Sequence, residues 1–207
     1  MQQAHDTFTI KLGDAIVQLP ARAVVENYLR SFLDKTPAST HITAIDRDTP
    51  PPIGTFWYGQ GGIYASTMRG ENGPDYHLIV AHSADGFTKE ITWGSQGKTE
   101  DGAQSDYDGL KNTFALYQSK HSHPVAEWAN DLNIEGHEDW YLPARRELRL
   151  CWVNVPELFE DGWYWSSTQY SADLAWYQYF DDGLQYFSLV KANKGRARAV
   201  RRLLVIQ

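Results

Sequence analysis

The tryptophan content constrains this chain more than any other feature. Eight tryptophans occur in 207 residues, and 14% of all residues are aromatic. Trp is large, stiff and amphipathic, so this many tryptophans indicate either an unusual core or a recognition surface. Such a chain is not disordered, because its apolar area offsets the entropy lost on ordering. The length predicts one large domain, or one domain with a small appendage.

The charge and the cysteine count exclude several classes of protein. The chain carries 19 Lys+Arg against 26 Asp+Glu, a net charge of -7. This balance argues against a general binder of nucleic acid or of anionic membranes. The single cysteine excludes an internal disulfide framework and a multi-cysteine zinc site.

The N-terminal sequence bears on where the protein is made. It shows no basic segment followed by an apolar run of about 7–15 residues, so we predict no Sec signal peptide. No window approaches about 18 consecutive apolar residues, so we predict no membrane insertion. We expect cytoplasmic synthesis without a signal peptide, which is compatible with later release on a virus particle.

The first fifty residues form a segment with its own pattern. Residues 7–19 alternate as a β-hairpin with its turn at Gly13-Asp14. From Pro20 a 3.6-residue periodicity predicts a helix, and residues 36–55 are linker-like. We predict that residues 1–50 attach or oligomerise the protein and that residues 51–207 form a ligand-binding domain.

The larger segment mixes short strands with helices, which predicts the α+β class. We expect strands at 63–64 and 76–81, an irregular loop at 86–110, a helix at 110–132 broken at 121–124, a helix at 143–154, and short strands within 163–202.

Four ordered motifs occupy the last third of the chain. They are W-x-L-P-x-x-x-E-L, W-S-S-T, A-W followed by a glycine turn, and a terminal V-R. In these motifs the chain resembles the bacterial and phage family named after the C-terminal domain of the Legionella collagen-like adhesin. The residues that carry the resemblance are Trp140, Leu142, Pro143, Glu147, Leu148, Trp165, Ser166, Ser167, Thr168, Ala175, Trp176, Gly183, Val200 and Arg201.

The resemblance implies a C-type-lectin-like fold of the formylglycine-generating-enzyme subtype. That subtype includes the variable receptor-binding proteins of diversity-generating retroelements, among them a phage tail tropism determinant. It also implies that a homo-oligomer, such as a trimer, is plausible. We therefore expect the motif residues to be structural. Trp140, Trp165 and Trp176 would fill the core while each indole N–H binds a loop carbonyl, and Arg201 would pair with Glu147.

The residues give little support to catalysis or to a metal. The resemblance implies a pair of active-site thiols for oxidase activity, but this chain has only Cys151, so we predict no enzyme and no cofactor. The segment from Glu100 to Gly109 matches a calcium EF-hand loop poorly. A solvated acidic loop is the favoured interpretation, and a calcium site using Asp106 and Asp108 is the open alternative.

The stretch from Trp176 to Ser188 carries the functional prediction. On a strand Trp176 and Gln178 share one face, and Tyr177 and Tyr179 share the other. The recurrent Trp of the resemblance sets the first face inward, so the second should face solvent. Exposed Tyr, Ser and Asp on a rigid sheet have the composition of a binding surface, although Tyr is common on ordinary strands. The predicted ligand-binding residues are Tyr170, Ser171, Asp173, Tyr177, Tyr179, Asp181, Tyr186 and Ser188.

These observations predict a non-catalytic recognition protein, encoded by a phage or prophage. Its ligand would be a cell-surface protein or glycan and not a nucleic acid. In the relatives diversified by a retroelement, the same region is the randomised binding surface. The alternative is an intracellular prophage accessory or structural protein that binds other proteins through residues 1–50.

Overall fold

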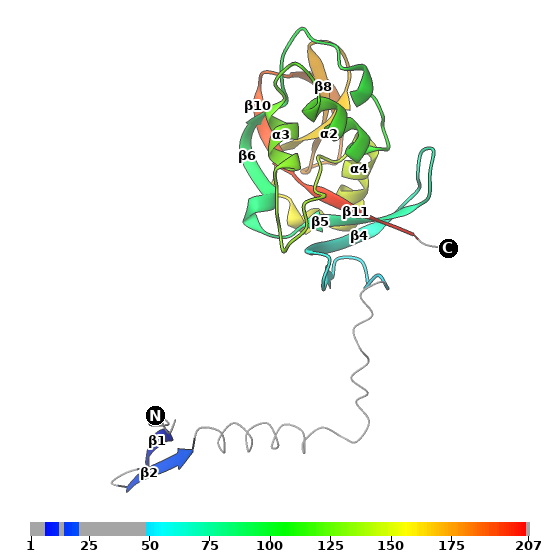
Figure 1. The fold of residues 1–207 in the computed structure, drawn as a ribbon. Helices are drawn as coiled ribbons and strands as arrows, with labels where there is room; N and C mark the ends of the chain where they lie inside the picture. The colour runs from blue at the N-terminus through cyan, green and yellow to red at the C-terminus, as the bar shows by residue number, and fades with distance from the viewer. Residues whose placement is uncertain (1–6, 13–14, 21–48, 206–207) are drawn as a thin grey trace. The chain divides into compact units, whose positions relative to one another are not determined.

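The computed structural model describes residues 7–12, 15–20 and 49–205 (Figure 1). The chain divides into two compact units, Met1–Ile45 and Asp46–Gln207. In the first unit, β1 (Thr7–Leu12) and β2 (Ala15–Pro20) form an antiparallel pair. The predicted hairpin is therefore confirmed, whereas the helix predicted after Pro20 lies outside the described residues.

Two sheets organise the second unit. One has the strand order β11-β5-β4-β3, and all its pairs are antiparallel. The other has the order β6-β10-β7-β8-β9, in which only β10 and β7 run parallel. The strands are β3 (Phe56–Trp57), β4 (Gly62–Met68), β5 (Tyr76–Ala81), β6 (Phe87–Thr92), β7 (Trp163–Gln169), β8 (Leu174–Tyr179), β9 (Gln185–Val190), β10 (Lys194–Arg198) and β11 (Val200–Leu204).

Between β10 and β11 the chain passes from one sheet to the other through a single residue. Ala199 separates β10 from β11 and is fully buried. Its N–H donates to the carbonyl of Gly86, and its carbonyl accepts from the N–H of Ala81. These bonds hold the corner where the two sheets meet.

Three α-helices lie within the described residues, which makes the fold mixed α+β. Asp108 caps the first, because its side chain accepts a hydrogen bond from the N–H of Lys111. Pro124 opens the second, in agreement with the predicted break at 121–124. The helices are α2 (Gly109–Tyr117), α3 (Pro124–Asn130) and α4 (Arg145–Asn154), and the 3₁₀ turns are η1 (Ala84–Gly86), η2 (Asp101–Ala103) and η3 (Pro156–Leu158).

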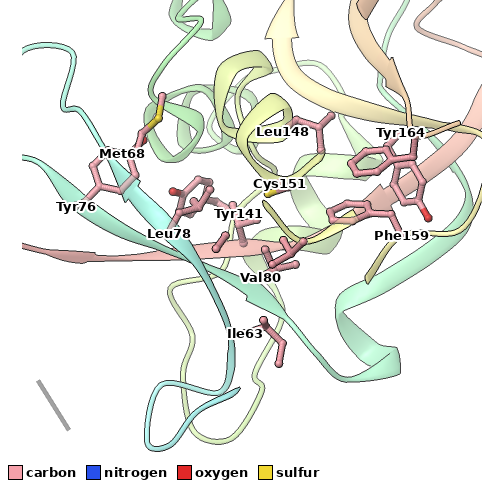
Figure 2. Close-up of a cluster of buried hydrophobic side chains, with 14 residues drawn as sticks. Ile63, Met68, Tyr76, Leu78, Val80, Tyr141, Leu148, Cys151, Phe159 and Tyr164 are labelled. Atoms are coloured by element: carbon pink, nitrogen blue, oxygen red, sulfur yellow. The ribbon is translucent and has the colours of Figure 1, made fainter. Parts of the chain in front are cut away.

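The core consists of separate clusters on the two sheets. Figure 2 shows the first, where Leu148 and Cys151 of α4 meet Leu78 and Val80 of β5. In the second, Trp93 and Trp165 pack with residues of α2 and α3, such as Leu116 and Val125. The first cluster therefore consists of tyrosine, phenylalanine and aliphatic residues, whereas the buried tryptophans lie in the second cluster and in two smaller ones, which contain Trp140 and Trp57.

One segment differs from its predicted structure. Residues 86–110 were expected to form an irregular loop, but Phe87–Thr92 is a strand, β6. It pairs antiparallel with β10, from Phe87 opposite Arg198 to Thr92 opposite Lys194. The expectation was wrong because a long-range pairing fixes this half-exposed edge strand, and the Gly- and Ser-rich sequence after it masks the local pattern.

Candidate functional site

Strand β8 presents its side chains differently from the predicted arrangement. Tyr177, expected in solvent, is only 6% exposed, and Trp176, expected inside, is half-buried. The ring of Tyr177 packs on Trp163 and Trp165, with centroids 5.6 and 6.3 Å apart. The expectation was wrong because β8 lies between β7 and β9, with the tryptophan cluster against one face and α4 against the other.

The side chain of Trp176 meets α4 through a cation–π contact. The guanidinium carbon of Arg145 lies 3.7 Å from the Trp176 ring centroid. The Arg145 Nε donates to Gln185 Oε1 at 3.2 Å, and Gln185 Nε2 donates to the Arg145 carbonyl at 2.6 Å. Gln185 Nε2 also donates to Gln178 Oε1 at 2.7 Å. These bonds fasten β8 and β9 to the start of α4.

Exposed aromatic rings gather around β9, the outer strand of the five-stranded sheet in the described part of the chain. Tyr186 is 38% exposed and Phe187 is 42% exposed. Because they are neighbours on a strand, they point to opposite faces and cover both sides of the sheet edge. Leu184 in the preceding turn and Tyr170 in the loop after β7 are also exposed. We call Tyr170, Trp176, Leu184, Tyr186 and Phe187 the β9 aromatic surface.

Each exposed ring of β9 rests on another ring. Phe187 stacks on Tyr170, with centroids 4.1 Å apart, and meets Trp176 edge-on at 5.1 Å. On the opposite face, Tyr186 stacks on Tyr177 at 5.9 Å and meets Tyr179 edge-on at 5.8 Å. The exposed rings are therefore held in place before any ligand arrives.

The predicted polar residues have mixed positions. Asp173, Asp181 and Ser188 are exposed, as expected, whereas Ser171 is half-buried. The Oγ of Ser171 accepts the N–H groups of Asp173 and Leu174, and Asp181 Oδ1 accepts the N–H of Gly162 at 2.8 Å. Ser171 and Asp181 thus stabilise turns.

Most of the motif residues lie in the core, where the sequence predicted them. Trp165 is fully buried, and its Nε1 donates to the carbonyl of Ile91 at 3.1 Å. Ser166 Oγ donates to the Trp176 carbonyl at 2.8 Å. The indole N–H of Trp140 has no acceptor among the described residues, so the expected bond to a loop carbonyl is absent there. The other buried members are Leu142, Pro143, Glu147, Leu148, Ser167, Thr168, Ala175, Gly183, Val200 and Arg201.

The expected pair between Arg201 and Glu147 is wrong. Arg201 pairs with Asp139, with Nε–Oδ1 and Nη2–Oδ2 distances of 2.9 Å, and donates to the Gln60 carbonyl. Glu147 instead accepts hydrogen bonds from Tyr76 and from three further donors. These donors are Tyr141 Oη at 2.8 Å, Ala144 N–H at 2.7 Å and Gly109 N–H at 3.2 Å. Arg201 has a closer carboxylate at Asp139, and Glu147 is already saturated with neutral donors.

Burial dominates the electrostatics at the domain centre. Glu147 is fully buried, and this desolvation raises its pKa to about 7, although the hydrogen bonds from Tyr76, Ala144 and Tyr141 act in the opposite direction. Burial likewise raises the pKa of the Cys151 thiol. A fully buried thiol with a raised pKa is a poor nucleophile.

A second titratable cluster lies beside Trp93. Glu100 Oε1 accepts from Ser119 Oγ at 2.9 Å and lies 2.8 Å from His121 Nδ1 and 3.0 Å from His123 Nε2. Burial would raise the pKa of Glu100, but these hydrogen bonds outweigh it and lower the pKa. Burial lowers the pKa of His123. The cluster ties the loop before η2 to the turn between α2 and α3.

The weak calcium candidates are both engaged with arginines. Asp106 Oδ2 lies 3.3 Å from Arg145 Nη1, and Asp108 Oδ1 lies 3.1 Å from Arg202 Nη1. Within the described residues, no group of three or more His, Cys, Asp or Glu side chains could hold a metal ion.

The sequence did not indicate Phe187, Leu184 or Arg145 as members or supports of the surface. Local alternation would place Phe187 opposite Tyr186 and hence inside. Only the outer position of β9 in the sheet exposes both faces. No local signal identifies a strand as the outer one.

No family model and no curated protein matches the chain. In the part of the chain that the structure describes, no helix has the length and apolarity needed to cross a membrane.

Proposed function

We propose that this chain is a non-catalytic recognition protein with a C-type-lectin-like domain. It binds a cell-surface protein or glycan through the β9 aromatic surface. The observation that carries the proposal is the backing of each exposed ring by another ring. Phe187 rests on Tyr170, and Tyr186 rests on the buried Tyr177.

Preorganisation explains why this arrangement suits recognition. A Tyr or Phe side chain has few rotamers to lose, and stacking restricts them before binding. A ligand that covers these rings removes apolar area from water without a large ordering cost. The hydrogen bonds of Gln185 to Gln178 and to Arg145 hold the strand rigid beneath the rings.

The chemistry of the interior supports a role without catalysis. Cys151 is fully buried, and so is Glu147, whose oxygens are occupied by four donors. A reacting group must reach its substrate, and neither of these side chains meets solvent. The origin in a phage or prophage and the attachment role of residues 1–50 stay predictions.

Selective blocking of the surface tests the proposal. The only native cysteine, Cys151, is buried, so an engineered exposed cysteine can be labelled alone. Leu184→Cys carrying a polyethylene glycol maleimide should lose binding to the bacterial cells that the unlabelled chain binds in a panel. The matched control, Gln118→Cys with the same label on the exposed end of α2, should still bind. Loss of binding in the control but not at position 184 would overturn the proposal.

A further inference from the structure

A groove lies next to the β9 aromatic surface, between the end of β4, the loop before α2, and α4. In Figure 1 the β4–β5 hairpin extends beside α4, and the two elements are in contact. The groove has a volume of about 430 Å³. Its lining residues are Met68, Arg69, Tyr107, Arg145, Arg146, Arg149, Leu150, Val153 and Gln185.

The charged side chains of this groove are all positive. Four arginines line it and no carboxylate does, although the whole chain has a net charge of -7. Arg69 and Arg146 are exposed and have no acidic partner among the described residues. The guanidinium of Arg146 lies over the Tyr107 ring, 4.5 Å from its centroid. The groove is thus a local positive site on an acidic protein, which favours an anionic ligand.

The hydrogen-bonding groups of the groove further restrict the chemical class of ligand that fits it. A guanidinium offers only donors, so its matched partner is a group that only accepts, such as a carboxylate. The one amide, Gln185, already uses its oxygen for Arg145 and its nitrogen for Gln178. Neutral sugar hydroxyls need acceptors as well as donors, and the lining supplies few acceptors. The groove therefore fits carboxylates better than a neutral glycan.

Aliphatic side chains complete the lining. Met68, Leu150 and Val153 contribute apolar surface, and Val153 is 59% exposed. A ligand that fits this mixture carries an apolar group next to an acidic one. A protein segment with Asp or Glu beside an aliphatic or aromatic residue carries both groups next to each other along one chain.

Arg145 connects the groove with the β9 aromatic surface. It lines the groove, and its guanidinium also stacks on Trp176 at 3.7 Å. Gln185 links them as well, because it lines the groove and precedes Tyr186 on β9. One extended ligand can therefore contact both sites without a gap between them.

We propose that the ligand of the β9 aromatic surface is an acidic segment of a protein. Its carboxylates lie between Arg69 and Arg146, and an adjacent apolar side chain lies on Met68, Leu150 and Val153. This inference rests on the proposed function, since it names the class of ligand for the same surface. Of the two ligand classes in the proposed function, the inference specifies a protein and not a glycan.

Selection from a displayed random-peptide library tests this inference on the full chain. Peptides enriched on the wild-type chain should combine Asp or Glu with a neighbouring apolar residue. Arg69→Gln with Arg146→Gln should weaken binding of these peptides by at least roughly tenfold, since charge-assisted hydrogen bonds are the strong ones. Lys111→Gln with Lys120→Gln, two exposed cations on and after α2, should leave binding unchanged. Raising the salt from about 50 to about 300 mM should also weaken binding.

Three other outcomes separate the inference from the proposed function. Enrichment of neutral peptides whose binding requires Tyr186 and Phe187 but not the arginines would overturn the proposal of an acidic ligand and would still support binding at the β9 aromatic surface. Enrichment of acidic peptides whose binding requires the arginines alone would support the groove as a binding site and overturn the role of the β9 aromatic surface. A third outcome is that no peptide is enriched while polygalacturonate or heparin binds and this binding requires the arginines. This outcome would overturn the protein ligand in favour of an acidic glycan.

Discussion

The domain centre around Glu147 and the β9 aromatic surface both use tyrosine, with opposite results. At the centre, Tyr76 and Tyr141 are buried, and their hydroxyls donate to one carboxylate. At β9, Tyr170 and Tyr186 keep part of their rings in solvent and are held by stacking. Tyrosine acts as scaffold where its hydroxyl has a fixed buried acceptor, and it offers a binding surface where a ring face stays exposed.

The two regions also differ in what they connect. Glu147 accepts from β5 through Tyr76, from the start of α2 through Gly109, and from the residue before α4 through Ala144. Its loss should therefore disturb several elements at once. The rings of β9 contact the neighbouring strand β8 and Tyr170 in the loop before it, so their loss should change binding more than folding.

The largest effect is expected from Glu147→Ala. The change leaves four buried donors without their acceptor. Each unsatisfied buried donor costs about 1–3 kcal/mol, so we expect a loss of about 3 kcal/mol or more. Urea unfolding followed by tryptophan fluorescence measures the loss. The exposed Glu157→Ala should change stability by less than about 0.5 kcal/mol. A loss at Glu147 no larger than at Glu157 would show that the centre is not a scaffold.

The next prediction concerns the pH dependence of folding stability. Burial raises the pKa of Glu147 to about 7, above its value of about 4.3 in an unfolded chain. The folded state then holds a proton that the unfolded state has lost, so this group's contribution to stability falls as pH rises from about 4.3 to about 7. Carbon-13 NMR of the Glu147 carboxyl should show a midpoint near pH 7. A midpoint below pH 4 would mean that the hydrogen bonds from the four donors lower the pKa of Glu147 more than burial raises it.

A matched pair of tyrosine variants sharpens the comparison with a smaller change. Tyr141→Phe removes one hydroxyl from Glu147 and should cost about 1–2 kcal/mol, because a hydrogen bond to a buried carboxyl group is lost. Tyr186→Phe removes a hydroxyl at the exposed surface and should stay within about 0.5 kcal/mol. Thermal unfolding of the two variants side by side measures both. Equal losses would remove the distinction between the two regions.

A small stability effect is also expected from Tyr186→Ala with Phe187→Ala. Both rings are more than a third exposed and lie on an outer strand. We expect a loss of about 1 kcal/mol or less, with an unchanged far-ultraviolet circular dichroism spectrum. Unfolding of the domain by this change would mean that the rings are core and not a surface.

Local sequence patterns predicted much of the fold. Alternation identified the hairpin of β1 and β2, and helical periodicity over 110–132 with a break at 121–124 identified α2 and α3. These features depend on residues close together in the chain. The burial of Trp140 and Trp165 was also predictable, because large tryptophans at motif positions suit a core.

The orientation of β8 could not be predicted in the same way. Alternation shows that Tyr177 and Tyr179 share a face, but it does not show what covers that face. Strand order decides this, since β7 and β9 flank β8 and bring Trp163 and Tyr186 to it. Arg201 is similar, because the position of Asp139 in space determined its partner. The exposed aromatic surface therefore lies on β9, one strand further out than the predicted position on β8.

One measurement tests the central claim most directly: binding of the fluorescently labelled chain to the same panel of bacterial cells. Tyr186→Ala with Phe187→Ala is compared with Phe114→Ala with Tyr117→Ala, a second exposed aromatic pair on α2 of similar exposure. We predict at least roughly tenfold weaker binding for the β9 pair, since buried aromatic contacts dominate interfaces, and unchanged binding for the α2 pair. Unchanged binding of the β9 pair, with loss in the α2 pair, would contradict the account.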